Sequence, residues 1–159
     1  EMTSAGQFFT NLLMFIGASP GSTGGGVKTT TFGTLFFVLW ALMRGRDDVV
    51  IIGRRLSHRT IFKALAVVMI GVLLIFAVTM ALTITEKFDF LDVFFETVSA
   101  FGTVGLSTGI TGGLSPIGRL LIIITMFVGR VGPMTLATAI GEERKKNFVR
   151  YPEEKLMIG

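Results

Sequence analysis

The sequence predicts an all-α membrane protein whose helices are interrupted by glycine-rich loops. Three observations lead to this fold class. Half of the 159 residues are hydrophobic and 16% are charged, whereas soluble domains carry about 25% charged residues; the mean hydropathy is +0.70. One long segment, residues 64–85, contains no charged residue. Two further apolar stretches are each broken near the middle by glycines.

The first broken stretch occupies residues 1–43. It runs from Phe8–Ile16 through the loop Gly17–Thr31 to Phe32–Met43. Each half is too short to cross a bilayer alone, so we read the two halves as one span interrupted at mid-depth. Non-helical backbone at that depth is tolerated where it faces protein or a water-filled cavity. Broken helices of this kind often mark an ion or substrate path.

The uncharged segment 64–85 predicts a transmembrane helix within residues 60–85. At 1.5 Å per residue it is roughly 33 Å long, which matches a hydrocarbon core of about 30 Å. The alternative is a buried core helix of a soluble protein. Such helices rarely extend this far without a polar face, so we favour the membrane span.

The next segment, "DFLDVFFETVSAF" at 89–101, predicts a short helix with Asp89 as N-cap and Asp92 in its first turn. It would reach about 18 Å, roughly half of a bilayer. The alternative is an amphipathic helix on the membrane surface. After a loop rich in Gly, Ser and Thr, Ser115-Pro116 predicts the start of a last span over 115–140. That span is interrupted at "GRVGP", residues 129–133.

Basic residues are distributed unevenly along the chain. The segment between the first two spans and the tail after the last span hold eleven of them: Arg44, Arg46, Arg54, Arg55, Arg59, Lys63, Arg144, Lys145, Lys146, Arg150 and Lys155. The segment from Glu86 to Ser115 holds one basic residue, Lys87. The positive-inside rule therefore places the loop 44–59 and the tail 141–159 in the cytoplasm. This topology explains the basic pI of 9.9 without a nucleic-acid partner.

A half-span helix followed by a glycine loop suits a filter for cations. The helix directs the negative end of its dipole toward the pore axis, and loop carbonyls replace the hydration shell of an ion such as potassium. Glycine allows the backbone angles that this requires. The candidate filter is 102–107, with Gly105 central and K⁺ held by carbonyls of Thr103, Val104 and Gly105. The full candidate set is Gly102, Thr103, Val104, Gly105 and Leu106.

The loop "GASPGSTGGGVKTTT" resembles a phosphate-binding loop at first sight. A Walker A motif needs glycine directly before the lysine, but Val27 separates Gly26 from Lys28. We therefore read the loop as a flexible intramembrane plug, and Arg130 as its partner, because an arginine at the bilayer centre costs several kcal/mol unless it faces polar groups. The plug residues are Gly17, Ser19, Gly21, Ser22, Thr23, Gly24, Gly25, Gly26 and Lys28.

Four segments together resemble the membrane subunit of Ktr-type potassium uptake systems, in the Trk/Ktr/HKT superfamily. They are "GASPGSTGGGVKTTTF", "ETVSAFGTVGLS", "MFVGRVGPMTLA" and the final "YPEEKLMIG". The resemblance implies a potassium-channel-like pore of four M1–P–M2 repeats, each a span, pore helix, filter loop and span. Residues 1–43 would end the third repeat and 60–140 form the fourth. Gly105 would then be a filter glycine, Gly17–Thr31 the gate, and Arg130 the gate-contacting arginine.

The resemblance also implies partners and a location. It predicts a multi-pass protein of the bacterial plasma membrane that forms a homodimer and docks on a cytosolic nucleotide-binding ring of RCK/KTN type. The chain would carry no cofactor and no catalytic residue; potassium would be its cargo, with sodium as an alternative or coupling ion. Four filters are needed and this chain has one, so we expect a fragment. The rival hypotheses are an ATP-driven pump subunit and a non-pore membrane subunit of a Na⁺/K⁺-translocating ATPase.

Overall fold

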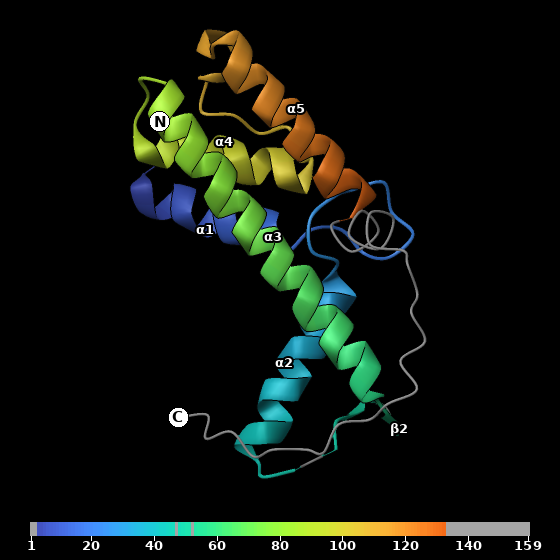
Figure 1. The fold of residues 1–159 in the computed structure, drawn as a ribbon. Coiled ribbons are helices and arrows are strands. Elements are labelled where there is room, and N and C mark those ends of the chain that lie inside the picture. Colours follow the sequence, from blue (N-terminus) through green and yellow to red (C-terminus); the bar gives the residue numbers. More distant parts are fainter. Residues whose placement is uncertain (1–2, 47, 52, 133–159) are drawn as a thin grey trace, which may run out of the picture.

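A computed structural model of the chain describes residues 3–46, 48–51 and 53–132, and this part is predominantly helical, as predicted (Figure 1). The predicted helix Met134–Ile140 and the tail 141–159 lie outside the described residues. The elements are α1 (Ser4–Phe15), α2 (Thr29–Met43), β1 (Val50–Ile51), β2 (Arg54–Arg55), α3 (His58–Thr85), α4 (Phe90–Gly102), a 3₁₀ turn (Thr111–Gly113) and α5 (Pro116–Val131).

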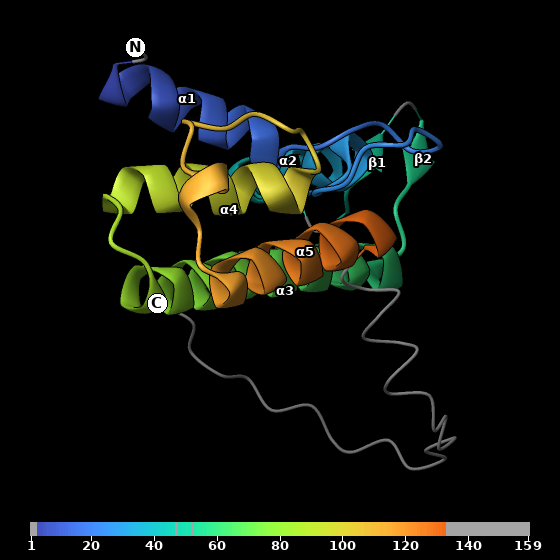
Figure 2. The ribbon, with the colours of Figure 1, turned by 90° about the horizontal axis from the view of Figure 1, so that it is seen from above.

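Helix α4 lies in the middle of the molecule. Figure 2 shows α1 on one side of it and the pair α3 and α5 on the other. In Figure 1, α1 and α4 lie side by side and cross the long helix α3 obliquely, whereas α2 turns away and runs beside the N-terminal half of α3. The helices on either side of the loop 17–28 therefore do not share one axis.

The helix ends follow local capping chemistry. The Ser115 hydroxyl accepts a hydrogen bond from the Gly118 N–H, and Pro116 occupies the first turn of α5, as the sequence predicts. Asp89 occupies the N-cap position of α4, and Asp92 lies in its first turn. Helix α5 continues through Arg130 and ends at Val131, so the regular helix stops inside the predicted interruption at 129–133.

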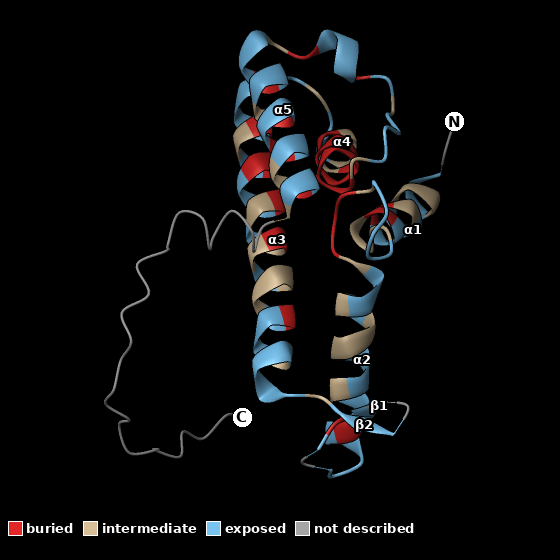
Figure 3. Ribbon diagram, turned by 90° about the vertical axis from the view of Figure 1, so that its right-hand side faces the viewer, coloured by how far each residue is buried: buried red, intermediate tan, exposed pale blue. Residues whose placement is uncertain are grey.

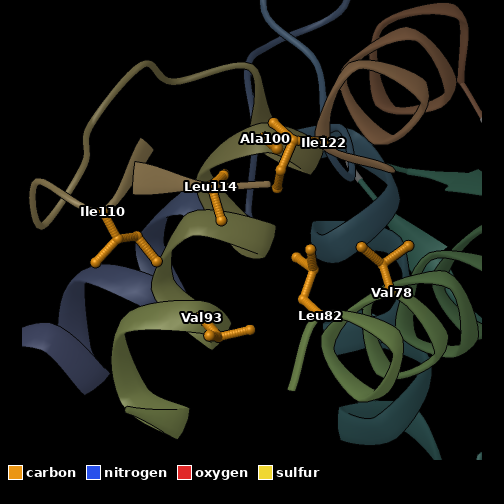
Figure 4. Close-up of a cluster of buried hydrophobic side chains, with 7 residues drawn as sticks. All are labelled: Val78, Leu82, Val93, Ala100, Ile110, Leu114 and Ile122. Atoms are coloured by element: carbon orange, nitrogen blue, oxygen red, sulfur yellow. The ribbon is translucent and has the colours of Figure 1, made fainter. Parts of the chain in front are cut away.

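Burial is concentrated on α4. Every residue from Phe95 to Gly102 is buried, and the end-on view in Figure 3 shows this helix enclosed by its neighbours. Figure 4 shows one core cluster, in which side chains of α3, α4, α5 and the intervening loop converge: Val78, Leu82, Val93, Ala100, Ile110, Leu114 and Ile122. On the other side, Phe15 of α1 stacks on Phe101 of α4 with ring centroids 6.0 Å apart.

The outer surface of α3 is apolar. The exposed fractions of Phe76, Met80 and Ile84 are 66%, 66% and 74%. Soluble proteins rarely leave a continuous face of this kind uncovered. Among the described helices, α3 is the one with both the length and the apolar composition to cross a membrane, and α2 is a shorter apolar helix.

The segment between α2 and α3 contains one element with no clear sequence signal. Strands β1 and β2 form a two-residue antiparallel ladder in which Val50 pairs with Arg55, and the Arg55 guanidinium lies 2.7 Å from the Asp48 carboxylate. Gly53, with φ of +71°, supplies the turn between the strands. This basic segment lies at the opposite end of α3 from Glu86 (Figure 1).

Candidate functional site

Three segments distant in sequence meet at the C-terminal end of α4. The loop 17–28 approaches from one side and the end of α5 from another. The Gly25 N–H donates to the Thr103 hydroxyl at 2.8 Å and to the Gly102 carbonyl at 3.2 Å. The Gly26 N–H donates to the Gly129 carbonyl at 3.3 Å. The structure therefore joins the predicted plug to the predicted filter and to the last helix.

Glycine is required where these backbones touch. A Cβ on Gly25 would lie 3.0 Å from the carbonyl oxygens of Phe101 and Gly129, and a Cβ on Gly129 would lie 2.0 Å from that of Phe101. Within the loop, a Cβ on Gly17 would lie 2.0 Å from the Gly25 carbonyl oxygen. Side chains at these positions would hold the segments apart, so the glycines of this junction are explained by close packing.

The loop has a buried base and an exposed tip. The base is closed by two backbone hydrogen bonds, from the Gly17 N–H to the Val27 carbonyl at 2.8 Å and from the Val27 N–H to the Phe15 carbonyl at 3.2 Å. Val27 is fully buried, whereas Gly21 to Thr23 are exposed. The Lys28 ammonium donates to the Gly24 carbonyl at 2.9 Å. This lysine therefore folds back onto its own loop.

The hydrogen bonds of the loop base also bear on the nucleotide hypothesis. A phosphate-binding loop presents free backbone N–H groups to its anion. Here the N–H groups of Gly17, Gly25, Gly26 and Val27 donate to protein oxygens. The base of the loop is committed to protein contacts, which disfavours phosphate binding.

The predicted filter residues divide into two groups. Gly102 is the buried last residue of α4, and its carbonyl accepts the Gly25 N–H. After it the chain reverses at Thr103, with φ of +52°, and again at Gly105, with φ of +83°. Within the described residues, no hydrogen bond is made to the carbonyl oxygens of 103–106. Val104 and Leu106 are exposed.

A groove lies between the loop and the predicted filter. Its volume is about 430 Å³, and its walls come from α1, the loop 17–28 and residues 102–106. Thr10 and Thr103 contribute polar atoms, and Gly17, Gly24 and Gly102 contribute backbone. The groove thus borders both segments that the sequence singled out.

Arg130, the predicted partner of the loop, lies in the last turn of α5. Its side chain is exposed, and within the described part of the chain no hydrogen bond joins it to the loop. The loop instead contacts the backbone of the neighbouring Gly129. A contact of this kind depends on how closely two backbones approach in the fold, and the spacing of residues along the sequence does not predict that.

Two carboxylates that hold segments of the fold together, one in α4 and one after α3, were not singled out from the sequence. Glu96, in the middle of α4, is 6% exposed and accepts a short hydrogen bond from the Thr111 hydroxyl. Glu86, after α3, accepts hydrogen bonds from the hydroxyl and the N–H of Ser115, at 2.5 and 3.1 Å. These two bonds hold the pKa of Glu86 below its ordinary value, and the bond from the Ser115 hydroxyl has the larger effect. The sequence offered one signal that Glu96 has a special role, which is that a charged residue lies in the middle of the largely apolar segment 90–101.

Comparisons with known proteins agree on one family. The family model described as TrkH, cation transport protein, matches residues 1–150. The chain is 44% identical over 159 residues to Ktr system potassium uptake protein D of Bacillus subtilis, and 44% identical over 151 residues to protein B of the same system in that organism. It is 38% identical over 165 aligned residues to the potassium/sodium uptake protein NtpJ of Enterococcus hirae.

These alignments cover nearly all of this chain but only part of each relative. They include 100%, 95% and 100% of the chain, and 35%, 34% and 37% of the respective relatives. The chain therefore spans about a third of the length of the curated relatives it matches. The similarity to Ktr-type proteins that the motifs indicated is confirmed.

Proposed function

We propose that this chain, which belongs to the TrkH family of cation transport proteins, contributes one filter segment and one gating loop to a pathway that takes potassium into the cell. Two of the relatives named above are potassium uptake proteins, and the third is a potassium/sodium uptake protein. The chain's role in such uptake is inferred from the junction at the end of α4.

The observation that carries the proposal is the state of the carbonyls after α4. A buried helix ends at Gly102. Of the next four residues, Thr103 is half-buried and 104–106 are exposed, and their carbonyl oxygens accept no hydrogen bond from the described residues. Such oxygens can coordinate a dehydrated monovalent cation. The negative end of the α4 dipole adds to the attraction. We assign K⁺ coordination to Thr103, Val104 and Gly105.

The loop 17–28 would act as the gate beneath this filter. Its base is hydrogen-bonded to Gly102, Thr103 and Gly129, and it borders the groove beside the filter. Since these bonds come from only two N–H groups, those of Gly25 and Gly26, a moderate displacement of the loop would break them together. The described conformation would then correspond to a closed gate.

The repeat architecture and the topology are part of the same proposal. The order α3, α4, exposed loop, α5 corresponds to the span, pore helix, filter and span of one M1–P–M2 repeat. The basic segment 44–59 would lie in the cytoplasm of a multi-pass plasma-membrane protein. We further propose homodimerisation and docking of a cytosolic nucleotide-binding ring of RCK/KTN type, with sodium as an alternative or coupling ion.

The filter assignment is tested by Gly105→Ser in the intact protein, with K⁺ and Na⁺ uptake measured in a host that lacks its own potassium uptake. A serine at φ of +83° strains the loop although it meets no atom within 4 Å. We expect a fall in K⁺ over Na⁺ preference of about tenfold or more, since displaced oxygens lose strong contacts with the ion.

Gly53→Ser is the matched control. Gly53 has φ of +71° and also has open space around it, but it lies in the basic segment between α2 and α3, far from the filter. It should therefore suffer the same backbone strain and keep its K⁺ preference. Equal K⁺ preference in wild type and in well-expressed Gly105→Ser would remove the filter assignment.

A further inference from the structure

Glu96 is a carboxylate kept inside the helical core at a considerable energetic cost. It lies in the middle of α4, is 6% exposed, and its Oε2 atom is buried without a hydrogen-bond partner among the described residues. Leaving a buried polar atom without a partner destabilises a fold, and more so when the atom is charged. A residue retained at this cost calls for an explanation beyond packing.

The other oxygen of Glu96 ends a chain of hydrogen bonds. The Gly109 N–H donates to the Ser107 hydroxyl at 2.9 Å, Ser107 and Thr111 share a hydrogen bond of 2.8 Å, and Thr111 donates to Glu96 Oε1. Since the single hydroxyl proton of Thr111 goes to Glu96, Ser107 must donate to Thr111. All three bonds thus point toward one carboxylate, and such chains of hydrogen bonds strengthen cooperatively.

This relay fixes the far end of the exposed filter segment. The near end is fixed by Gly102, the last residue of α4. Residues 107–111 are held to the same helix by the bond from Thr111 to Glu96, which lies six residues before Gly102. Between the two attachment points, the N–H groups of Thr103 and Val104 still donate to carbonyls of α4. Residues 105–106 make no backbone hydrogen bond among the described residues, and Gly105 adds flexibility there. The direction of the carbonyls in this stretch therefore depends on both attachments.

We propose that Glu96 is a positioning residue that sets the geometry of the 103–106 carbonyls, and hence cation selectivity, by holding Thr111. The inference rests on the proposed filter function. Glu96 does not touch the ion; it acts through the relay. Its carboxylate is the acceptor that orders Thr111, Ser107 and Gly109.

The test measures the K⁺ over Na⁺ preference and the KM for K⁺ of the intact transporter in proteoliposomes. Glu96→Gln keeps the shape and weakens the acceptor, Thr111→Val removes the donor, and Thr111→Ser retains the hydroxyl. A hydrogen bond to a charged group has a strength corresponding to about tenfold or more in an equilibrium. We expect Glu96→Gln and Thr111→Val each to lower the K⁺ over Na⁺ preference about tenfold. The double variant should lower it no further. Thr111→Ser should keep the wild-type preference.

Glu86→Gln is the matched structural control. Glu86 also accepts a hydroxyl and holds two segments together, but at Ser115, away from the filter. It should lower thermal stability and leave the K⁺ preference unchanged. If Glu96→Gln lowered only stability, as Glu86→Gln should, the positioning role would be overturned. It would also be overturned if Glu96→Gln changed selectivity and Thr111→Val did not, because the carboxylate would then act by its charge.

Gly105→Ser separates the two levels of the proposal. If Gly105→Ser shifts the preference and Glu96→Gln and Thr111→Val do not, the filter stands and the positioning role fails. If Gly105→Ser and the relay variants all leave it unchanged, the filter assignment itself fails. If Glu96→Gln does not reach the membrane, the comparison of Thr111→Val with Thr111→Ser still tests the positioning role, because each of these variants changes only one small group.

Discussion

Gly25 is the residue at which the loop, the filter and the last helix come closest together. Its N–H is shared between Gly102 and Thr103, and its α-carbon lies against two backbone carbonyls. Thr103 adopts a left-handed backbone, with φ of 52°, which a β-branched residue rarely does. The hydroxyl that this conformation presents to Gly25 is a contact that compensates for the strain.

Gly25→Ala should increase potassium flux. The new methyl group would lie 3.0 Å from two carbonyl oxygens and the Thr103 side chain, so the loop must move outward. Overpacking costs about 1–3 kcal/mol, and about 1 kcal/mol raises the population of a displaced loop about fivefold. Initial rates of ⁸⁶Rb⁺ uptake at equal expression would measure this. Gly33→Ala in α2, where the methyl group meets nothing within 4 Å, should leave the rate unchanged.

A rate at or below that of wild type in a correctly folded Gly25→Ala protein would count against the gate. The same holds for a rate increase that Gly33→Ala reproduces, because the effect would then come from the loss of a glycine in general.

At the scale of elements, Glu86 connects the end of α3 to the start of α5. Its carboxylate accepts both polar hydrogens of Ser115, the N-cap of α5. A negative charge is favourable at that helix N-terminus. Gly118, one turn into α5, lets the carboxylate approach, because a Cβ there would lie 2.4 Å from Glu86 Oε1. The two long helices are thereby held in register at the end opposite the basic segment.

This connection predicts a pH-dependent stability. Because the folded pKa of Glu86 lies below its ordinary value of 4.5, the ionised group stabilises the fold fully above that value, and the contribution is lost as the pH falls through the lowered pKa. The Tm of detergent-solubilised wild type should exceed that of Glu86→Gln at pH 7, and the difference should shrink below about pH 4. A difference of equal size at pH 7 and pH 3 would contradict the assignment.

Sequence reasoning found the elements whose signals are local. Ser115-Pro116 marks the start of α5 through a capping bond within a few residues, and Asp89 stands at the N-cap position of α4, although its side chain makes no capping hydrogen bond. Contacts between distant segments left weaker signals. The relay from Thr111 to Glu96 joins residues fifteen apart, and the contact of the loop with Gly129, where Arg130 was expected, depends on the approach of two backbones.

At the scale of the whole molecule, the surface agrees with the family. Large apolar side chains cover the outside of α3 and α5, including Met80, Ile84 and Phe127. The polar and glycine-rich groups gather where the loop, α4 and α5 meet. Lipid or further protein in a membrane is the environment that covers such an apolar surface. The chain has about a third of the length of its relatives, so under the proposed function it would line one side of a conduit.

The central claim is that the carbonyls of Thr103, Val104 and Gly105 coordinate the transported ion. The most direct measurement is the anomalous scattering of Rb⁺ in crystals of the intact transporter. We expect an ion peak in contact with these oxygens, weakened or lost in Gly105→Ser and retained in Gly53→Ser. Rb⁺ bound only elsewhere in the protein, with residues 103–106 turned away from every ion, would contradict it.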